Sequence, residues 1–155
     1  MKNLKFLLVI FLIPAFAFAL GPKPNKISAK KVIRRTAIVI LHAHKKVKEG
    51  KVYTGNLARA IAHQKFARKL YREGKYARAI HQSRRARRLA ILAIKANKGG
   101  DIAEMKDSKG EEALGSGSPS DDELDKEVLT AMPNEPVKDE DVINSEPDVD
   151  LGDNE

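Results

Sequence analysis

The stretch ARKLYREGKYARAI, residues 67–80, contains the turn of a helical hairpin and decides the fold. On both sides of Gly74, small and apolar residues recur at the period of an amphipathic helix, and the glycine interrupts that period. The pattern predicts a helix over residues 56–73, with Asn56 as its N-cap, and a second helix over residues 75–97. The residues expected to pack this hairpin are Phe66, Ala67, Leu70, Gly74, Tyr76, Ala79, Ile80 and Ala86.

Another amphipathic pattern precedes the hairpin and covers residues 26–49, with Asn25 or Ser28 as the N-cap and Gly50 as the stop. Its apolar residues fall on one face when they are placed at about 100° intervals. They are Ala29, Val32, Ile33, Thr36, Val39, Ile40, Ala43 and Val47. Three helices with short connections can bury a shared core, so the sequence predicts an all-α fold, a small three-helix bundle over residues 26–99.

The hairpin also carries an ordered set of small, apolar and turn positions, formed by Ala67, Leu70, Tyr71, Gly74, Tyr76, Ala79, Ile80 and Ala86. In this order, over about residues 60–93, the sequence resembles a single tetratricopeptide repeat. His63 and Ser83 stand where such a repeat usually has aromatic residues, and no second copy is present. The resemblance implies two antiparallel helices that pack against the preceding helix, and it implies binding of a protein partner.

The N-terminus has the layout of a secretory signal peptide over residues 1–19. Two early lysines precede an apolar run, and AFA at residues 17–19 offers the small residues that a signal peptidase reads. The alternative is a retained membrane anchor, but the apolar stretch over residues 6–20 has 15 residues, fewer than the roughly 20 that span a bilayer. We therefore expect cleavage, an extended segment at residues 20–25, and export to the periplasm or out of the cell.

Charge divides the rest of the chain into two parts. Residues 21–100 carry 23 Lys and Arg against two acidic residues, a balance of +21, whereas residues 101–155 carry 4 Lys against 19 acidic residues, a balance of −15. The second part is rich in Gly, Ser, Pro, Asp and Glu and poor in apolar residues, so burial cannot offset the entropy of ordering it. We therefore predict that residues 100–155 form a disordered acidic tail.

One stretch of this tail has a helical signal. Ser120 and Glu123 have the spacing of a capping box, and apolar residues follow at i, i+4 and i+8, namely Leu124, Val128 and Met132. The pattern predicts a short helix at residues 121–132, which is too short to be stable alone. Two interpretations remain open, a transient turn in a solubilising tail or a binding motif.

The residue types that catalysis or metal binding needs do not converge in this sequence. The chain has no Cys, and His42 and His44 diverge on a helix, so they cannot share a metal ion. His63 and His81 can meet across the hairpin, but no carboxylate lies near them in sequence to complete a site. The sequence has no Gly-rich phosphate loop and no nucleophile elbow. We therefore expect no enzymatic activity, no cofactor and no bound metal ion.

The basic surface is the strongest functional feature. Residues that can form one positive face are Lys30, Lys31, Arg34, Arg35, Lys65, Arg68, Lys69, Arg72, Arg84, Arg85, Arg87 and Arg88. Such a face attracts polyanions, and arginine grips phosphate, sulfate or carboxylate through a planar fork. A solvated surface is the alternative, but charge of one sign repels itself, which favours binding.

Arg87 stands apart because the helical projection places it between Ile80 and Ile94, inside the apolar stripe. Either its side chain extends along the edge of a small interface, or a carboxylate draws it inward. Glu73 is the nearest acid in sequence, and Glu49 lies at the other turn. A third possibility is a partner contact marked by apolar residues on the charged face of the first helix, Ile38 and Leu41.

These features together predict a non-enzymatic, exported binding module whose partner is an anionic polymer, a membrane surface or an acidic protein. The nearest polyanion is the acidic tail itself, which a flexible linker holds at millimolar effective concentration, and which we expect to screen the basic face. The alternatives are a protein-interaction adaptor that uses the tetratricopeptide-like hairpin, or a cationic membrane-active or structural matrix protein. Few aromatic residues and export argue against an intracellular nucleic acid as partner.

Overall fold

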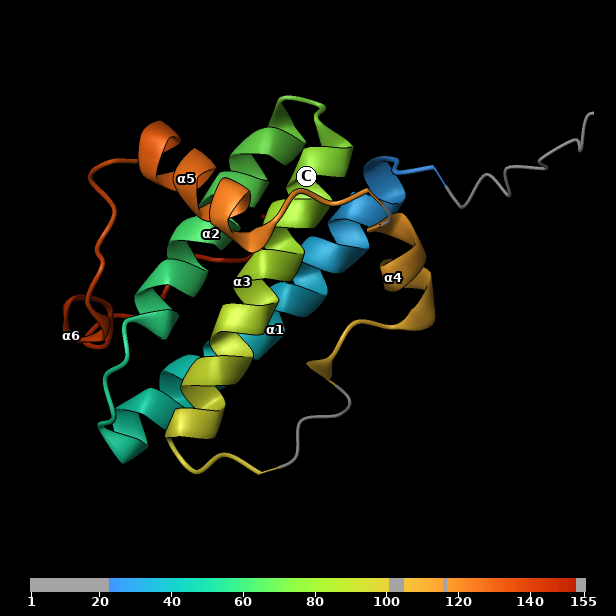
Figure 1. The fold of residues 1–155 in the computed structure, drawn as a ribbon. Helices are drawn as coiled ribbons and strands as arrows, with labels where there is room; N and C mark the ends of the chain where they lie inside the picture. Colours follow the sequence, from blue (N-terminus) through green and yellow to red (C-terminus); the bar gives the residue numbers. More distant parts are fainter. Residues whose placement is uncertain (1–22, 101–104, 116, 153–155) are drawn as a thin grey trace, which may run out of the picture.

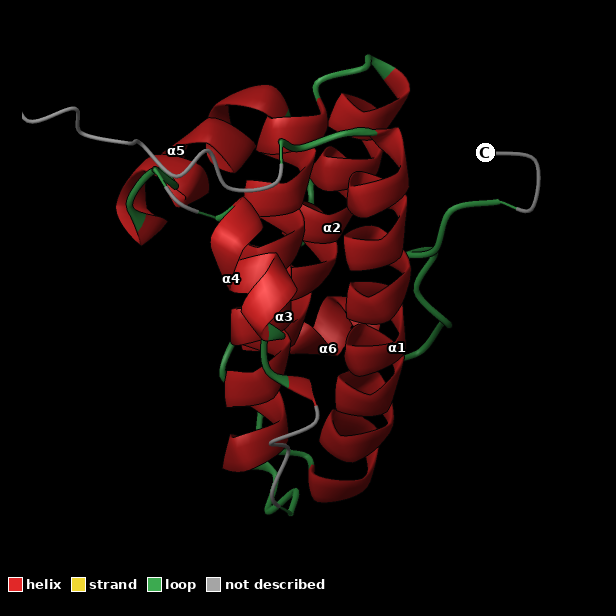
Figure 2. Ribbon diagram, turned by 90° about the vertical axis from the view of Figure 1, so that its right-hand side faces the viewer, coloured by secondary structure: helices red, strands yellow, loops and turns green. Residues whose placement is uncertain are grey.

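Three long helices form the body of the protein. The structure is a computed structural model that describes residues 23–100, 105–115 and 117–152. Helix α1 spans Lys26–Gly50, α2 spans Asn56–Arg72 and α3 spans Tyr76–Ala96. They run side by side, α3 packs against both of the others (Figure 1), and Figure 2 shows only helices and loops in the described ranges. The all-α class and the three-helix bundle are therefore confirmed.

The N-terminus of α1 is fixed by a capping box. The Asn25 side chain accepts a hydrogen bond from the Ser28 backbone N–H, and the Ser28 hydroxyl accepts one from the Asn25 N–H, both at 2.9 Å. These bonds satisfy two donors that a helix start otherwise leaves unpaired. The helix ends one residue later than predicted, at Gly50. All eight residues of its predicted apolar face are buried.

The turn between α2 and α3 depends on Gly74, which has a φ of +76°. The N–H of Gly74 bonds to the carbonyl of Tyr71 at 3.0 Å, and the N–H of Lys75 bonds to that of Leu70 at 2.9 Å. This pair of bonds is the Schellman arrangement, which favours glycine at the left-handed position. The predicted packing residues lie between the helices: Phe66, Ala67, Leu70, Ala79, Ile80 and Ala86 are buried, and Tyr76 is half-buried with its ring 5.6 Å from that of Tyr71.

The predicted N-cap of α2 is wrong. The cap position is Gly55, with a φ of +75°, and it has no side chain with which to cap the helix. The Asp139 carboxylate, from the acidic tail, accepts hydrogen bonds there from the backbone N–H groups of Thr54, Gly55 and Ala58 at 2.8–2.9 Å. Asn56 loses the role because a carboxylate buried at a helix N-terminus satisfies more donors and also meets the positive end of the helix dipole.

The described part of the tail lies against the bundle. It contains three short helices, α4 at Lys109–Leu114, α5 at Asp121–Ala131 and α6 at Asp139–Val142. The tail contributes side chains to both apolar clusters of the core, namely Val128, Val142, Ile143, Val149 and Leu151. The disorder expected of residues 100–155 stays a prediction. In the conformation described here, the tail covers part of the basic domain.

Helix α5 lies where the sequence predicted a short helix. Ser120 caps it, and the Glu123 carboxylate accepts a hydrogen bond from the Ser120 N–H at 2.8 Å. Leu124 and Val128 are buried, and Met132 is partly buried against the same core. A helix of this length needs a packing partner, and α2 and α3 supply it.

The predicted signal peptide at residues 1–19 lies outside the described residues. Of the predicted extended segment at 20–25, residues 23–25 are described and have no regular secondary structure.

Candidate anion-binding face

The arginines of α3 lie on two sides of the helix, and each side faces a different segment of the tail. Arg84 and Arg87 pair with carboxylates just before and within α4, whereas Arg85 and Arg88 pair with carboxylates of α5. Figure 1 shows α4 and α5 on different sides of α3. Because neighbouring positions on a helix are about 100° apart, the structure divides the predicted positive face into two.

Arg87 is the centre of the first side, with only 1 % of its surface exposed. Its guanidinium donates to Asp107 at 3.2 Å and to Glu111 at 3.0 Å. It also donates to the Thr36 hydroxyl at 3.0 Å and to the Val32 carbonyl at 3.1 Å, both on α1. Of the interpretations left open for Arg87, inward attraction by carboxylates is therefore the one observed. The carboxylates belong to the tail, and neither Glu73 nor Glu49 pairs with Arg87.

Two further arginines share these carboxylates. Arg84 Nε donates to Asp107 at 2.6 Å, and Arg35 Nη1 donates to Glu111 at 2.5 Å. Burial raises the pKa of Glu111, but hydrogen bonds from Arg87 and the Ser108 N–H, with the charges of Arg87 and Arg35, outweigh it and leave the pKa below its ordinary value. Glu111 is therefore ionised at neutral pH and links α1, α3 and α4.

The second side is a paired contact between α3 and α5. Arg85 binds Asp125 in a two-pronged geometry, with Nε to Oδ1 and Nη2 to Oδ2 both at 2.8 Å, and its Nη1 reaches Asp121 at 2.6 Å. Arg88 also binds Asp121, and Arg59 on α2 also binds Asp125. Two acidic residues one turn apart on α5 are thus matched by arginines on α3 and α2.

The electrostatics of this contact favour the charged forms. The hydrogen bond from Arg85 to Asp125 raises the pKa of Arg85. Burial raises the pKa of Asp125, but the hydrogen bond and charge of Arg85, with the charges of Arg59 and His63, lower it by more. The net pKa of Asp125 is therefore below its ordinary value. The contact is an ion pair at neutral pH.

The predicted cations of α2 face other parts of the tail or lie at the surface. Lys65 pairs with Glu135 at 2.7 Å, and Arg68 Nη1 binds the Asp148 carbonyl at 2.6 Å and its carboxylate at 3.0 Å. Lys69 and Arg72 are exposed at the surface. On α1, Lys31 is exposed, and Lys30 and Arg34 are partly buried. Arg35 belongs to the first side, because it pairs with Glu111, which also pairs with Arg87.

The two histidines that the sequence placed across the hairpin take separate partners. His63 is buried, with Nδ1 2.6 Å from Gln82 Oε1 and Nε2 3.0 Å from Asp125 Oδ1. His81 Nδ1 lies 2.7 Å from the Ser118 hydroxyl. Burial is the main cause that lowers the pKa of both histidines. Within residues 23–100, 105–115 and 117–152, no three His, Asp or Glu side chains are grouped so as to hold a metal ion.

The sequence interpretation missed the individual tail residues that hold the arginines, namely Asp107, Glu111, Asp121 and Asp125, and also Asp139, which caps α2. One signal was available. Asp121 and Asp125 have i, i+4 spacing beside the predicted apolar stripe of α5, and Arg85 and Arg88 have i, i+3 spacing on α3. With these spacings, the two aspartates on one face of α5 can pair with the two arginines on one face of α3. The remaining acids carry no comparable pattern.

Comparisons of this chain with protein-family models, curated proteins and solved structures found no match. In the part of the chain that the structure describes, no helix combines the length and the apolar character that crossing a bilayer requires.

The arginines of this face bind carboxylate oxygens of the same chain. A guanidinium that binds a carboxylate through two parallel N–H bonds presents the same fork to a phosphate or a sulfate. In the described conformation those forks are occupied by the chain's own carboxylates, so an external anion has to compete with them.

Proposed function

We propose that this protein is a non-enzymatic, exported binding module for anionic polymers, and that its acidic tail competes within the same chain for the arginines that bind them. The observation that carries the proposal is the two-pronged pairing of Arg85 with Asp125, reinforced by Asp121. A side chain whose fork holds a carboxylate in this geometry is suited to the sulfate or phosphate groups of a polymer.

The competition depends on how readily α5 detaches. Helix α5 has 11 residues, and a helix of that length is marginal in water once its packing partner is lost. A polymer that displaces α5 therefore has to offset only the free energy with which α5 docks on the bundle, and the bundle itself does not have to unfold. The tether keeps the competing carboxylates at high effective concentration, so weak monovalent anions fail to displace them and densely charged polymers succeed.

The test compares two charge-matched variants of the full chain. Asp121→Asn with Asp125→Asn removes the carboxylates that hold Arg85, whereas Glu112→Gln with Glu140→Gln removes two negative charges from exposed residues that hold no arginine. Both are loaded on immobilised heparin and eluted with a NaCl gradient. We expect the first variant to elute at clearly higher salt than the second, with a steeper dependence of affinity on salt.

Equal elution of the two variants would mean that total charge alone sets the affinity, and it would refute competition by α5. Binding of heparin that is unaffected by salt would refute the polyanion proposal itself, because release of counterions is what makes such binding salt-dependent.

A protein-interaction adaptor is the second candidate, and one observation favours it. The hairpin of α2 and α3 already holds an amphipathic helix, α5, through buried Leu124 and Val128. A partner helix with the same pattern could dock there, which is a common mode of peptide recognition. Such docking rests on apolar burial, so salt would weaken it only slightly. The resemblance of residues 60–93 to a tetratricopeptide repeat stays a prediction in this context.

A further inference from the structure

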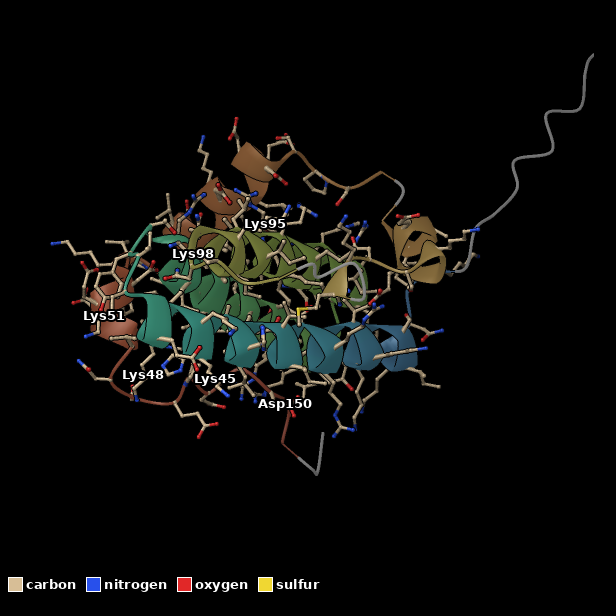
Figure 3. The ribbon with its side chains drawn as sticks, turned by 90° about the horizontal axis from the view of Figure 1, so that it is seen from below. Lys45, Lys48, Lys51, Lys95, Lys98 and Asp150 are labelled. Carbon is tan, nitrogen blue, oxygen red and sulfur yellow. The ribbon has the colours of Figure 1, made fainter. Side chains whose placement is uncertain are left out.

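Five lysines gather at the end of the bundle where α1 and α3 both terminate, and we call this surface the lysine end. Figure 3 shows Lys45, Lys48 and Lys51 on α1 and its cap, with Lys95 and Lys98 on α3 and the residues after it. All five side chains are exposed. None of them makes an ion pair or a side-chain hydrogen bond with the described residues, in contrast to most of the arginines on α3.

The lysine end is a fixed surface because Asn97 joins its two halves. The Asn97 side chain accepts a hydrogen bond from the Val52 N–H and donates one to the Val52 carbonyl, both at 2.9 Å. A Cβ on Gly50 would lie 2.4 Å from Asn97 Oδ1, so glycine at this position allows the close approach. The loop after α1 is thereby held against the C-terminus of α3, and Lys51 is kept near Lys98.

Two of these lysines occupy positions that backbone sterics assign to glycine. Lys51 has a φ of +55° and Lys98 a φ of +54°, and they are the two described non-glycine residues with positive φ. A residue with a Cβ is strained in this region, and glycine or asparagine commonly takes it at a helix end. Favourable interaction with the helix dipole accounts for Lys48 and Lys95 in the last turns. It does not explain a strained lysine at both ends.

Apolar side chains are exposed among the lysines. Val52 and Tyr53 follow Lys51 in the loop and are 45 % and 41 % exposed, and Leu92 is 48 % exposed one turn before Lys95. A tyrosine with an apolar body and a polar tip suits the interface between lipid and water. The surface thus combines positive charge with apolar side chains that are exposed to water.

We propose that the lysine end docks on the surface of a bilayer that contains anionic phospholipids. Its cations are all lysines, whose point charges suit a diffuse array of headgroups, whereas the arginine forks of α3 are matched to defined carboxylates. Val52 and Tyr53 favour a bilayer over a soluble polymer, because only the bilayer offers an apolar layer in which to bury them. Three acidic side chains lie near this surface: Glu49 pairs with Lys46, Asp139 accepts a hydrogen bond from the Thr54 N–H, and Glu146 lines a pocket with Lys45 and Lys48. This inference involves another surface than the proposed competition of α5.

The test uses the protein without residues 1–19, which contains every described residue, and vesicles of phosphatidylcholine with or without phosphatidylglycerol. The variant is Lys51→Gly with Lys98→Gly. Glycine relieves the backbone strain at both positions, so we expect a thermal midpoint equal to or above that of the parent. Each lysine near an anionic surface contributes roughly five-fold in affinity, so binding to the anionic vesicles should weaken about 25-fold.

The matched control is Lys26→Gln with Lys31→Gln, which removes two exposed charges near the start of α1, at its opposite end. We expect it to change vesicle affinity less than about three-fold, since charges beyond a Debye length contribute little. Equal weakening by both variants, or unchanged binding by the glycine variant, would overturn the proposal.

A second variant distinguishes the bilayer from a soluble polyanion. Val52→Ser with Tyr53→Ser keeps every charge and removes the apolar groups, so vesicle binding should weaken about ten-fold while heparin binding stays the same. If vesicle binding is unchanged in this variant, the lysine end is a site for polymers and the bilayer proposal fails. Asp121→Asn with Asp125→Asn should alter heparin binding and leave vesicle binding at the lysine end unchanged, which separates this inference from the proposed function.

Discussion

The carboxylate of Asp139 caps helix α2 at Ala58, which lies 81 residues earlier in the chain, through a hydrogen bond of 2.9 Å to the Ala58 N–H. The same carboxylate accepts bonds from the N–H groups of Thr54 and Gly55, and its side chain is fully buried. The first turn of α2 contains no acid of its own. The tail therefore covers the bundle and also supplies the cap that one of its helices lacks.

Replacing Asp139 with alanine should lower the free energy of unfolding by about 2 kcal/mol, because loss of a cap costs up to about 2 kcal/mol and leaves buried donors unpaired. Asp139→Asn should cost less, since its amide oxygen still accepts on one side. Urea denaturation measures both. Asp141→Ala, two residues away and exposed, is the control and should stay within about 0.5 kcal/mol of the parent. Similar losses at both positions would contradict the capping role.

The bundle was predictable because its information is local. The apolar faces of α1, α2 and α3 follow helical periodicity, and Gly74 marks the turn with the backbone conformation that only glycine adopts without cost. The capping of α5 was predictable for the same reason, since Ser120 and Glu123 lie three residues apart.

The contacts between the tail and the bundle were not predictable, because sequence distance says little about which charge meets which. Arg87 lies in the apolar stripe, and inward attraction by a carboxylate was one of the interpretations of its position. That the carboxylates are those of Glu111 and Asp107 depends on the path of the chain past α3. Asn56 has good capping chemistry and lost the cap of α2 to Asp139, which no local rule connects to it. The opposite net charges of the two segments predict that they attract each other. Which acidic side chain pairs with which basic one depends on how the segments pack.

Removing Arg87 should be costly because it leaves Glu111 and Asp107 charged without their buried partner. We expect Arg87→Met to lower the free energy of unfolding by about 3–5 kcal/mol, the range for breaking a buried ion pair. In a double-mutant cycle with Glu111→Gln, the combined loss should be smaller than the sum by about 1–3 kcal/mol. Arg88→Met is the control, because the Arg88 side chain is 41 % exposed, and its cost should stay below about 1 kcal/mol. Strict additivity would show that the pair does not act as a unit.

Stability should fall as the solution becomes acidic, and the tail contacts set the window. The pKa values of Glu111 and Asp125 lie below their ordinary values of 4.5 and 3.8, because hydrogen bonds and charges from arginines outweigh burial. A carboxyl whose pKa is lower in the folded state gives full stabilisation above the unfolded value, and this is lost as pH falls through the folded value. The carboxyl contribution to the urea midpoint should therefore be level above about pH 5 and fall progressively below pH 4.5. It adds to a decline that begins near pH 6.5, because the pKa values of His63 and His81 are also lower in the folded state.

The control for this prediction is the double variant Glu111→Gln with Asp125→Asn, which has no charge to lose at these positions. Its midpoint should be lower than that of the parent at pH 6, and the difference between the two should narrow as the pH falls below 4. A constant difference across this range would mean that other carboxyl groups carry the acid sensitivity.

Leu124→Ala should loosen α5 without unfolding the bundle, which is the condition that competition by the tail requires. Leu124 is 1 % exposed, and truncation of a buried leucine costs about 2–5 kcal/mol, so α5 amides should exchange hydrogen at least about 30-fold faster. The amides of Ile33 and Ile40 in α1 should change far less, because opening of α5 does not expose them. Leu129→Ala, at a side chain that is 63 % exposed, should leave both groups unaffected. If α1 and α5 instead accelerate by the same factor, the tail and the bundle unfold as one cooperative unit, and a polymer cannot displace α5 alone.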